Sequence, residues 1–460
     1  YYPSPFNNAI ILTADGVGEW ATTTVAIGKG NKIEMKKEIE FPHSLGLLYS
    51  AFTYYTGFKV NGGEYKLMGL APYGEPKFFQ IIMDNLIDIK EDGSFRLNQK
   101  YFDYATGLTM TNDKFDKLFG NLRRNPDEEK IAQFHMDIAA SIQKVTEFVM
   151  LKIVKSLHNE YKIENLCLAG GVALNCVANG KILKEKIFKN IWIQPAAGDA
   201  GGSLGAALGY WFNELKKERP NNNKDQMKCS YLGPEYSSLE IKDILKDIGA
   251  NFETLSKDEV LDFTTNNLIE GKAIGWFQGK MEFGPRALGG RSIIGDPRSP
   301  EMQKKLNLKV KFRESFRPFA PAVLLEDLRE WFDLESESPY MLLVGKVNKS
   351  KLIQQTTDQK SAKGLEKLDI IRSEIPAVTH VDDTARIQTV TAENGIYFDL
   401  LKKFKDKTGC PIIVNTSFNI RGEPPVNTPI DAYKCFMATD LDVLVIGNCI
   451  LEKNKQINFD

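Results

Sequence analysis

A polar break near the middle of the chain constrains its fold more than any other feature. Residues 216–223 read Lys-Lys-Glu-Arg-Pro-Asn-Asn-Asn, which offers charge, proline and asparagine but no periodic apolar face. Such a segment is typical of a linker between folded domains. The 460 residues of the chain are also too many for one small domain. We therefore expect a first domain at residues 1–212, a linker at 213–229 and a second domain at 230–460.

The first half carries the pattern of an α/β domain. An apolar run at 9–14 and strand-like segments at 22–27 and 33–41 predict three successive strands. From residue 131 to 157 apolar side chains recur every three or four positions, which predicts a long helix. Beyond it, a strand, a glycine turn and a helix occur twice in succession. This alternation predicts α/β layering.

Two acidic residues follow strands of this half and stand beside glycines. They are Asp15 and Asp199. Carboxylates can hold a cation at such a place, and glycines let backbone N–H groups approach a phosphate. Taken alone, the first loop favours a hairpin and the second a helix N-cap. Together with the glycine turn at 170–175, however, they resemble the split nucleotide cradle of the actin, hexokinase and sugar-kinase superfamily.

The second half contains a cationic stretch at residues 271–321. It holds eleven lysines and arginines against four acids, although the whole chain has a net charge of −1. Rigid guanidinium groups suit phosphate oxygens better than ammonium groups do. We expect Arg286, Lys311 and Arg317, which stand among Gly, Pro and Phe, to line a polyphosphate pocket. Single-stranded nucleic acid is a less favoured ligand for the same stretch, because the chain as a whole is neutral.

A solvated helix face is the expected place of the other lysines, Lys304, Lys305 and Lys309. Further along, a predicted strand at 412–414 ends in a polar turn that contains Asn415 and Ser417. Such a turn can line a ligand pocket, although by itself it is an ordinary loop.

Composition excludes several classes of protein. Lysine plus arginine (59) nearly equals aspartate plus glutamate (60), which argues against a protein that coats nucleic acid or an anionic membrane. No apolar run approaches the roughly 20 residues that cross a bilayer, and no signal-peptide pattern is present. The six cysteines form no C-x-x-C pair, so neither disulfides nor a zinc site is indicated. We expect a cytoplasmic protein with buried free thiols and without nucleic-acid or membrane partners.

Four motifs resemble, in the same order, those of the ATP-dependent O-carbamoyltransferases of antibiotic tailoring and nodulation-factor synthesis. They lie at 64–74, 169–175, 282–289 and 312–321. The resemblance spans nearly the whole chain and implies an actin/hexokinase-like (ASKHA, Kae1-like) domain followed by a YrdC-like α/β domain. The second domain would form carbamoyl-adenylate from carbamoyl phosphate and ATP. The first would pass the carbamoyl group to a hydroxyl of a small-molecule acceptor, such as a sugar or natural product.

The resemblance also implies the residues of the two sites. Carbamoyl phosphate and ATP would be held by Arg286, Lys311, Arg317, Arg386, Asn415 and Ser417, of which Arg286, Lys311 and Arg317 would be catalytic. The adenylate would face Gly170, Gly171 and Asn175 in the first domain. Asp15 and Asp199 would be the carboxylate ligands of iron, manganese or zinc, and magnesium would accompany ATP.

The chain starts at Tyr1 without an initiator methionine. Members of the family carry, upstream of the segment that matches residues 2–6, further strands with histidine metal ligands and an acidic catalytic residue. We therefore expect this chain to be a fragment or an N-terminally truncated product. The transfer step should then be impaired, whereas carbamoyl-adenylate can still form.

Two other functions fit parts of the sequence. An actin-fold kinase would phosphorylate a small hydroxylated substrate with Asp15 or Asp199 as the base, but it would leave the cationic second half without a role. A nucleotide-binding scaffold would bind ATP without turnover. The sequence leaves open the acceptor, the metal and whether the chain forms a homodimer.

Overall fold

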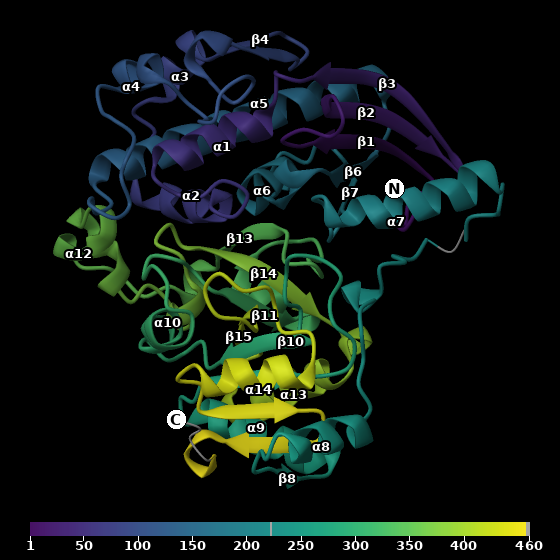
Figure 1. Cartoon of the computed structure of the whole chain (residues 1–460), viewed down its shortest axis with the longest axis vertical. Coiled ribbons are helices and arrows are strands. Elements are labelled where there is room, and N and C mark those ends of the chain that lie inside the picture. The colour runs from purple at the N-terminus through teal and green to yellow at the C-terminus, as the bar shows by residue number, and fades with distance from the viewer. Residues whose placement is uncertain (221–222, 457–460) are drawn as a thin grey trace. The chain divides into compact units, whose positions relative to one another are not determined.

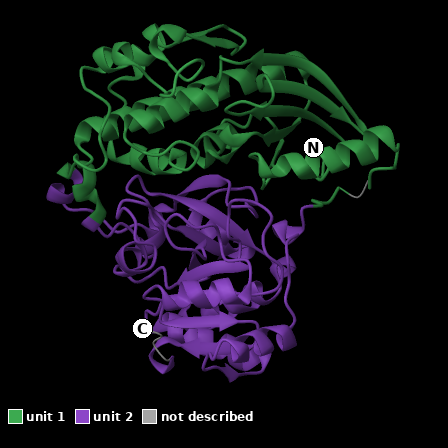
Figure 2. Ribbon diagram, in the orientation of Figure 1, with its two compact units in different colours: residues 1–226, 361–368 green, residues 227–360, 369–460 purple. Residues whose placement is uncertain are grey.

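The computed structural model describes residues 1–220 and 223–456 and divides into two compact units (Figure 2). The first comprises Tyr1–Gln226 with Ser361–Leu368, and the second comprises Met227–Lys360 and Asp369–Asp460. The division after Gln226 lies inside the expected linker, whose residues 221 and 222 fall outside the described residues, as do 457–460 of the expected second domain. No helix among the described residues combines the length and the apolar character needed to span a membrane.

One segment belongs to a different unit from the one we expected. Residues 361–368 fall within the predicted second domain but pack with the first unit. Gly364 explains the close approach, because a Cβ there would lie 2.8 Å from Oε1 of Gln133 and 3.3 Å from the sulfur of Met136. Non-local packing of this kind leaves no mark in a local sequence pattern.

A five-stranded sheet in the order β3-β2-β1-β6-β7 forms the centre of the first unit (Figure 1). The first three strands are an antiparallel meander, and β1, β6 and β7 run parallel. The meander and both later strands confirm the sequence prediction. The strands of this unit are β1 (Asn8–Ala14), β2 (Ala21–Lys29), β3 (Lys32–Glu40), β4 (Ile87–Ile89), β5 (Phe95–Leu97), β6 (Asn165–Ala169) and β7 (Asn190–Ile193).

The long predicted helix is present and organises the helices around it. It packs against the helices α1, α2, α3 and α6, and it buries an apolar face that includes Ile138, Ile142 and Val149. The helices of this unit are α1 (Leu45–Tyr55), α2 (Glu64–Leu70), α3 (Phe79–Asn85), α4 (Asp113–Phe119), α5 (Gln133–Tyr161), α6 (Cys176–Lys184) and α7 (Ala200–Gly209).

The second unit is built on a ten-stranded mixed sheet. Its order is β12-β13-β14-β11-β15-β10-β9-β16-β17-β8. The central strands β9, β10, β11 and β16 are buried along their whole length. The strands are β8 (Glu253–Thr254), β9 (Ile274–Phe277), β10 (Arg291–Gly295), β11 (Ala320–Leu324), β12 (Phe332–Asp333), β13 (Leu343–Val347), β14 (Thr384–Val390), β15 (Ile412–Ser417), β16 (Val443–Ile446) and β17 (Cys449–Glu452).

Helices accompany this sheet, and their starts follow local capping rules. Ser237 and Ser256 each form a capping box with a glutamate three residues later, which satisfies backbone N–H groups at the start of α8 and α9. All six cysteines are buried free thiols, as expected. The helices are α8 (Ser238–Asp247), α9 (Lys257–Ile269), α10 (Met302–Lys305), α11 (Leu328–Trp331), α12 (Thr357–Ser361), α13 (Ile396–Thr408) and α14 (Pro429–Met437).

Candidate functional site

One face of the second unit's sheet carries several of the polar residues that the sequence singled out there. On β15, Asn415 pairs with Ala320 of β11 and with Ile294 of β10, while Ser417 pairs with Ser292. Cross-strand partners share a face, and side chains two positions apart along a strand do so as well. Asn415 and Ser417 therefore point to the same side of the sheet.

A hydrogen bond across a small residue ties β14 to this face. Gln388 of β14 pairs with Ala322 of β11, and its Oε1 accepts a 2.6 Å bond from Nδ2 of Asn415. The two polar side chains can meet over β11 because that strand places only Ala320 and Ala322 between them. Arg386, two positions before Gln388 on β14, lies on the same face.

The loop that carries Arg286 is anchored to these strands. Nδ2 of Asn415 donates to the carbonyl of Ala287 at 3.0 Å, and Nε2 of Gln388 donates to the carbonyl of Leu288 at 2.8 Å. The half-buried Arg286 is next to the first of these carbonyls in the chain. Asn415 is 128 residues from Ala287 along the sequence, so the contact exists only in the folded unit.

A buried glutamate shapes the same loop from inside. Oε1 of Glu282 accepts hydrogen bonds from the backbone N–H groups of Leu288 (2.6 Å), Gly290 (2.8 Å) and Arg291 (3.3 Å). Arg291 is itself fully buried, with its guanidinium 3.5 Å from the centre of the Phe277 ring. Burial lowers the pKa of Arg291 to about 10, and the neighbouring Glu282 offsets part of this effect. Arg291, which we counted in the cationic stretch, is thus a structural residue of the loop.

Lys311 is buried against the end of β15. Its Nζ donates to the carbonyl and hydroxyl oxygens of Ser417 and to the carbonyl and Oδ1 of Asn419. Burial, together with the guanidinium groups of Arg313 and Arg317, holds the pKa of Lys311 well below its usual range. A negatively charged ligand at this place would relieve that repulsion.

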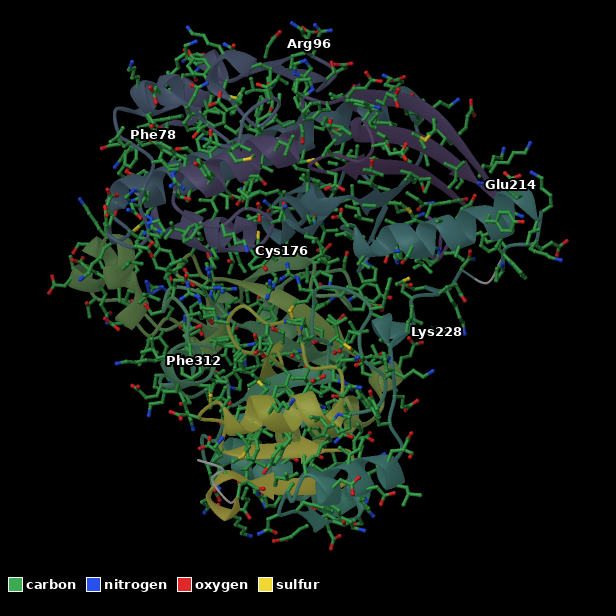
Figure 3. All side chains as sticks on the ribbon, in the orientation of Figure 1. Phe78, Arg96, Cys176, Glu214, Lys228 and Phe312 are labelled. Carbon is green, nitrogen blue, oxygen red and sulfur yellow. The ribbon has the colours of Figure 1, made fainter. Side chains whose placement is uncertain are left out.

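The residues that follow Lys311 turn the chain outward and add further charge. The backbone is left-handed at Phe312, labelled in Figure 3, with φ of 46°. This residue is 47% exposed while Lys311 is buried. Glu314 lies 3.9 Å from Nη1 of Arg317. Nε of Arg313 donates to Oδ1 of Asn307 at 2.7 Å, and its guanidinium lies over the Phe319 ring.

Sequence reasoning missed several residues of this arrangement. Asn419 binds the ammonium group of Lys311, Gln388 joins Asn415 to the Arg286 loop, and Glu282 orders that loop. Arg313 contributes charge beside Lys311. Asn419 could have been found, because it follows Ser417 by two positions in the polar turn after the predicted strand. Gln388 carries no local signal, since its role depends on strand order.

In the first unit, β1 and β6 bring their two loops together. Oδ1 of Asp15 accepts a 2.7 Å bond from the backbone N–H of Gly16, and Asp15 also accepts one from the backbone of Gly171. Burial raises the pKa of Asp15, the two backbone donors act in the opposite direction, and the nearby Asp199 raises it further. The structure therefore places Gly171 against Asp15, with Asp199 close enough to act on its charge.

The turn after β6 requires glycine at Gly170, and Gly171 leaves space beside the carboxylate of Asp15. Gly170 has φ of 87°, and a Cβ there would lie 2.2 Å from the carbonyl oxygen of Ala14. A Cβ at Gly171 would lie 2.8 Å from Oδ1 of Asp15. The absent side chains thus let β6 and its turn lie against the end of β1, where the carboxylate stands.

Asn175 and Asp199 each stand at the start of a helix. Asn175 is 9% exposed and caps α6 through a 3.0 Å bond from the backbone N–H of Ala178. Its amide also exchanges two hydrogen bonds with Gln143 of α5. Asp199 stands immediately before α7 and is exposed, but its side chain makes no capping bond. A direct contact of Asn175 with an adenylate remains a prediction.

The carboxylates present do not complete a metal site. Among the described residues there is no group of three or more His, Cys, Asp or Glu side chains placed to hold an ion. Asp15 and Asp199 together supply two carboxylates, whereas iron, manganese or zinc needs at least four ligands. The predicted ligand set is therefore incomplete within the described part of the chain.

Two family models match the chain, one in each half. A family model described as "Carbamoyltransferase N-terminus" matches residues 1–208, and one described as "Carbamoyltransferase C-terminus" matches residues 265–453. The chain belongs to the carbamoyltransferase family. Within this carbamoyltransferase, the first model covers the Asp15 neighbourhood, and the second covers the whole polar face with Arg286 and Lys311.

Individual relatives agree with this family. The chain is 58% identical to the uncharacterized protein sll1178 of Synechocystis over 99% of its own length and 74% of the relative. It is 37% identical to the nodulation protein NolNO of Sinorhizobium fredii over 98% of its own length and 62% of the relative. It is 29% identical to the 3'-hydroxymethylcephem-O-carbamoyltransferase of Streptomyces clavuligerus over 62% and 48% of the two chains.

Among solved structures, full-length HypF in its phosphate- and nucleotide-bound form gives a TM-score of 0.27 at 16% identity. The match covers 41% of this carbamoyltransferase chain and 25% of HypF, which is too little to inform the fold.

Proposed function

We propose that the chain is an ATP-dependent O-carbamoyltransferase whose second unit makes carbamoyl-adenylate. In this reaction, water cleaves carbamoyl phosphate to carbamate and phosphate. A carbamate oxygen then attacks the α-phosphorus of ATP, and pyrophosphate leaves. The observation that carries the proposal is the convergence of Lys311, the Arg286 loop, Asn415 and Ser417 on one face of the sheet.

The chemistry explains these residue types. Adenylation brings two polyanions together, so cations must offset their repulsion and the charge that develops on the attacked phosphorus. Arg286, Lys311 and Arg317 are proposed for this task, and Arg386, Asn415 and Ser417 would position carbamoyl phosphate and ATP. The lowered pKa of Lys311 supports the proposal, because a buried cation beside two guanidinium groups is stabilised by bound phosphate.

The first unit is proposed to carry out the transfer. The adenylate would lie at the Gly170-Gly171 turn, and an acceptor hydroxyl would attack the carbamoyl carbon, with AMP as the leaving group. The strand order β3-β2-β1-β6-β7 supports the actin-like (ASKHA, Kae1-like) fold for this unit, and a YrdC-like fold is proposed for the second. Asp15 and Asp199 are proposed as carboxylate ligands of a metal ion, and within the described residues they form only part of a ligand set.

The names of the relatives suggest the class of acceptor. One relative is named a cephem O-carbamoyltransferase and another a nodulation protein. We propose a small hydroxylated molecule as acceptor, with carbamoyl phosphate and ATP as co-substrates and magnesium bound to ATP. A homodimer and a cytoplasmic location stay predictions, as does the absence of nucleic-acid and membrane partners.

Pyrophosphate release tests the adenylation step in a single turnover. The chain at a concentration above that of ATP is mixed with ATP, magnesium and carbamoyl phosphate, and the nucleotide and phosphate products are separated. We expect AMP-containing product and pyrophosphate, and a rate about 10²-fold lower for Arg317→Ala because one charge-stabilising group is lost. Arg329→Ala, at an exposed position on α11, is the matched control.

Each rival function predicts a different product. A kinase would give ADP, and a scaffold would bind ATP without turnover even when carbamoyl phosphate is supplied. An Arg317→Ala protein that released pyrophosphate at the original rate would remove Arg317 from the proposed site.

A further inference from the structure

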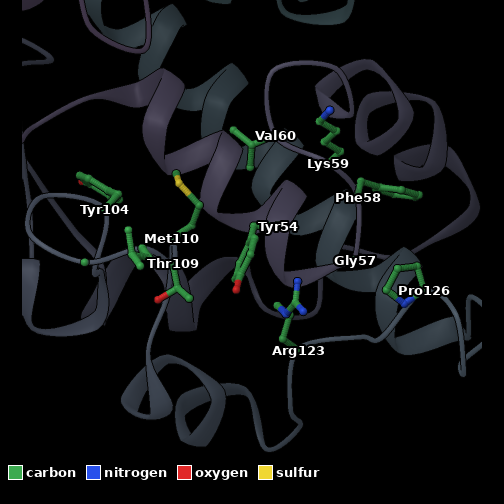
Figure 4. A pocket seen from close by; sticks show the side chains of 12 residues that line it. Tyr54, Gly57, Phe58, Lys59, Val60, Tyr104, Thr109, Met110, Arg123 and Pro126 are labelled. Atoms are coloured by element: carbon green, nitrogen blue, oxygen red, sulfur yellow. The ribbon is translucent and has the colours of Figure 1, made fainter. Parts of the chain in front are cut away.

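The first unit contains a cavity that the proposed reaction does not use. It has a volume of about 530 Å³ and lies at the C-terminal end of α1, between residues 57–60, the loop 104–110 and residues 123–126 (Figure 4). At the opposite end of α1, Oγ of Ser44 donates to the carbonyl of Asp15 at 2.8 Å. Since α1 has 11 residues, the cavity is about 15 Å from Asp15 along the helix axis.

The floor of the cavity is held in place by a buried arginine. Arg124 is 6% exposed, and its guanidinium donates to the carbonyls of Thr56 at 2.6 Å and Glu129 at 2.7 Å. Gly57, which lines the cavity, has φ of 78° and lies so close that a Cβ would be 2.8 Å from the carbonyl oxygen of Arg124. This corner therefore exists before any ligand binds.

The opposite wall is fixed in a similar way. The hydroxyl of Tyr104 donates to the carbonyl of Pro42 at 2.8 Å and accepts a bond from Nε2 of Gln99 at 3.1 Å. Its ring consequently has a set position on the lining. The hollow therefore has two fixed walls and a side open to solvent, where Lys59, Leu108 and Arg123 are exposed.

The lining combines positive charge with apolar and aromatic surface. Arg123 stacks its guanidinium over the ring of Tyr54, 4.3 Å from the ring centre, as Figure 4 shows, and Lys59 also lines the cavity. No carboxylate belongs to the lining, all of which lies in the described part of the chain. Asp116 accepts a bond from the backbone N–H of Arg123 but lies outside the lining.

We propose that this cavity binds a small organic anion that carries an aromatic ring. A carboxylate or phosphate group would pair with Arg123, which is held by its stack on Tyr54 and so loses little freedom on binding. Lys59 would add charge at the rim. The ring would lie against the half-buried side chains of Tyr104 and Met110 in the lining. This inference does not depend on the proposed carbamoyl transfer.

The test uses the fluorescent arylsulfonate 1-anilinonaphthalene-8-sulfonate as probe. Phenyl phosphate and benzoate should each displace it, whereas inorganic phosphate and benzyl alcohol, which have only the charge or only the ring, should not. Arg123→Gln should weaken probe binding about tenfold and Lys59→Gln about threefold, because charge-assisted hydrogen bonds are lost. Displacement by inorganic phosphate alone, or unchanged binding in Arg123→Gln, would overturn the proposal.

Two controls separate this cavity from other sites. Lys100 also lies over an aromatic ring, that of Tyr101 at 5.4 Å, but does not line the cavity, so Lys100→Gln should bind the probe normally. Arg317→Ala, which impairs the proposed phosphate site of the second unit, should likewise leave binding unchanged. Loss of binding in Arg317→Ala would assign the probe to that site and overturn the inference, without any bearing on the adenylation test.

Discussion

At the scale of one residue, the surroundings of Lys311 favour the binding of an anion. Four oxygen atoms of Ser417 and Asn419 accept hydrogen bonds from its ammonium group, but none of them carries a full negative charge. Within residues 1–220 and 223–456, no carboxylate forms an ion pair with this buried group, which lies near Arg313 and Arg317. Such an arrangement costs stability unless an anion binds, which is a common feature of sites that recognise phosphate.

The pH dependence of stability tests this description. Because the folded pKa of Lys311 is lowered, the unfolded chain binds more protons than the folded chain between that pKa and 10.5. The free energy of unfolding of the original protein should therefore rise with pH in this window, relative to that of Lys311→Met. Urea unfolding of both proteins between pH 7 and 9.5 measures the difference.

Lys309→Met provides the matched control, because Lys309 is exposed and only two positions away. Its difference from the original protein should not change with pH. A pH-independent difference for Lys311→Met as well would show that Lys311 is not a strained cation in the free protein.

At the scale of an element, the turn after β6 depends on the absence of a side chain at its glycines. Gly170 takes a left-handed backbone conformation against the end of β1, and Gly171 makes room for the carboxylate of Asp15. The helix α7, in contrast, contains glycines that no such approach requires, since a Cβ at Gly205 would meet no atom within 4 Å. Glycine is therefore needed for close packing at Gly170, whereas at Gly205 a side chain would fit.

Alanine substitutions distinguish these two roles. Gly170→Ala should lower the free energy of unfolding by about 3 kcal/mol, because the Cβ meets backbone and the conformation is left-handed. Gly205→Ala should raise it by about 1 kcal/mol, since alanine favours a helix and meets no obstacle. Urea unfolding measures both, and equal effects of the same sign would refute the distinction.

At the scale of the whole molecule, the segment that leaves the first unit is bound to the start of the chain. The guanidinium of Arg219 donates to the carbonyls of Tyr1, Tyr2, Ser4 and Phe6 at 2.7–2.9 Å. It also lies 4.3 Å from the centre of the Tyr1 ring. Although its composition predicts a linker, this part of the segment belongs to the folded first unit.

Proteolysis can show whether Arg219 holds this segment. In Arg219→Gln, cleavage by a glutamate-specific protease at Glu214 and Glu218 should be about tenfold faster, because the loss of charged hydrogen bonds raises the population of the open segment. Lys216→Gln, at an exposed position of the same segment, should be cleaved at the original rate. Equal rates in all three proteins would mean that other contacts hold the segment.

Local elements were largely predictable. The strand at 9–14 and the long helix at 131–157 were predicted from patterns that span only a few neighbours. In the structure both begin within two residues of the predicted start, and the long helix continues to Tyr161. In contrast, β10, β11 and β14 were not predicted. Their position depends on pairing with strands far along the chain, and β11 is buried throughout, so it shows no alternation.

The sequence by itself determined the α/β character of the first half, the motifs of the carbamoyltransferase family and the types of residue available for phosphate. The tertiary structure decided which of these residues meet. It placed Lys311 against Ser417, 106 residues away, and it made Arg291 a buried support and Asn175 a helix cap. The physical reason is that periodicity and capping act between neighbours in the chain, whereas these contacts depend on strand order and register across a sheet.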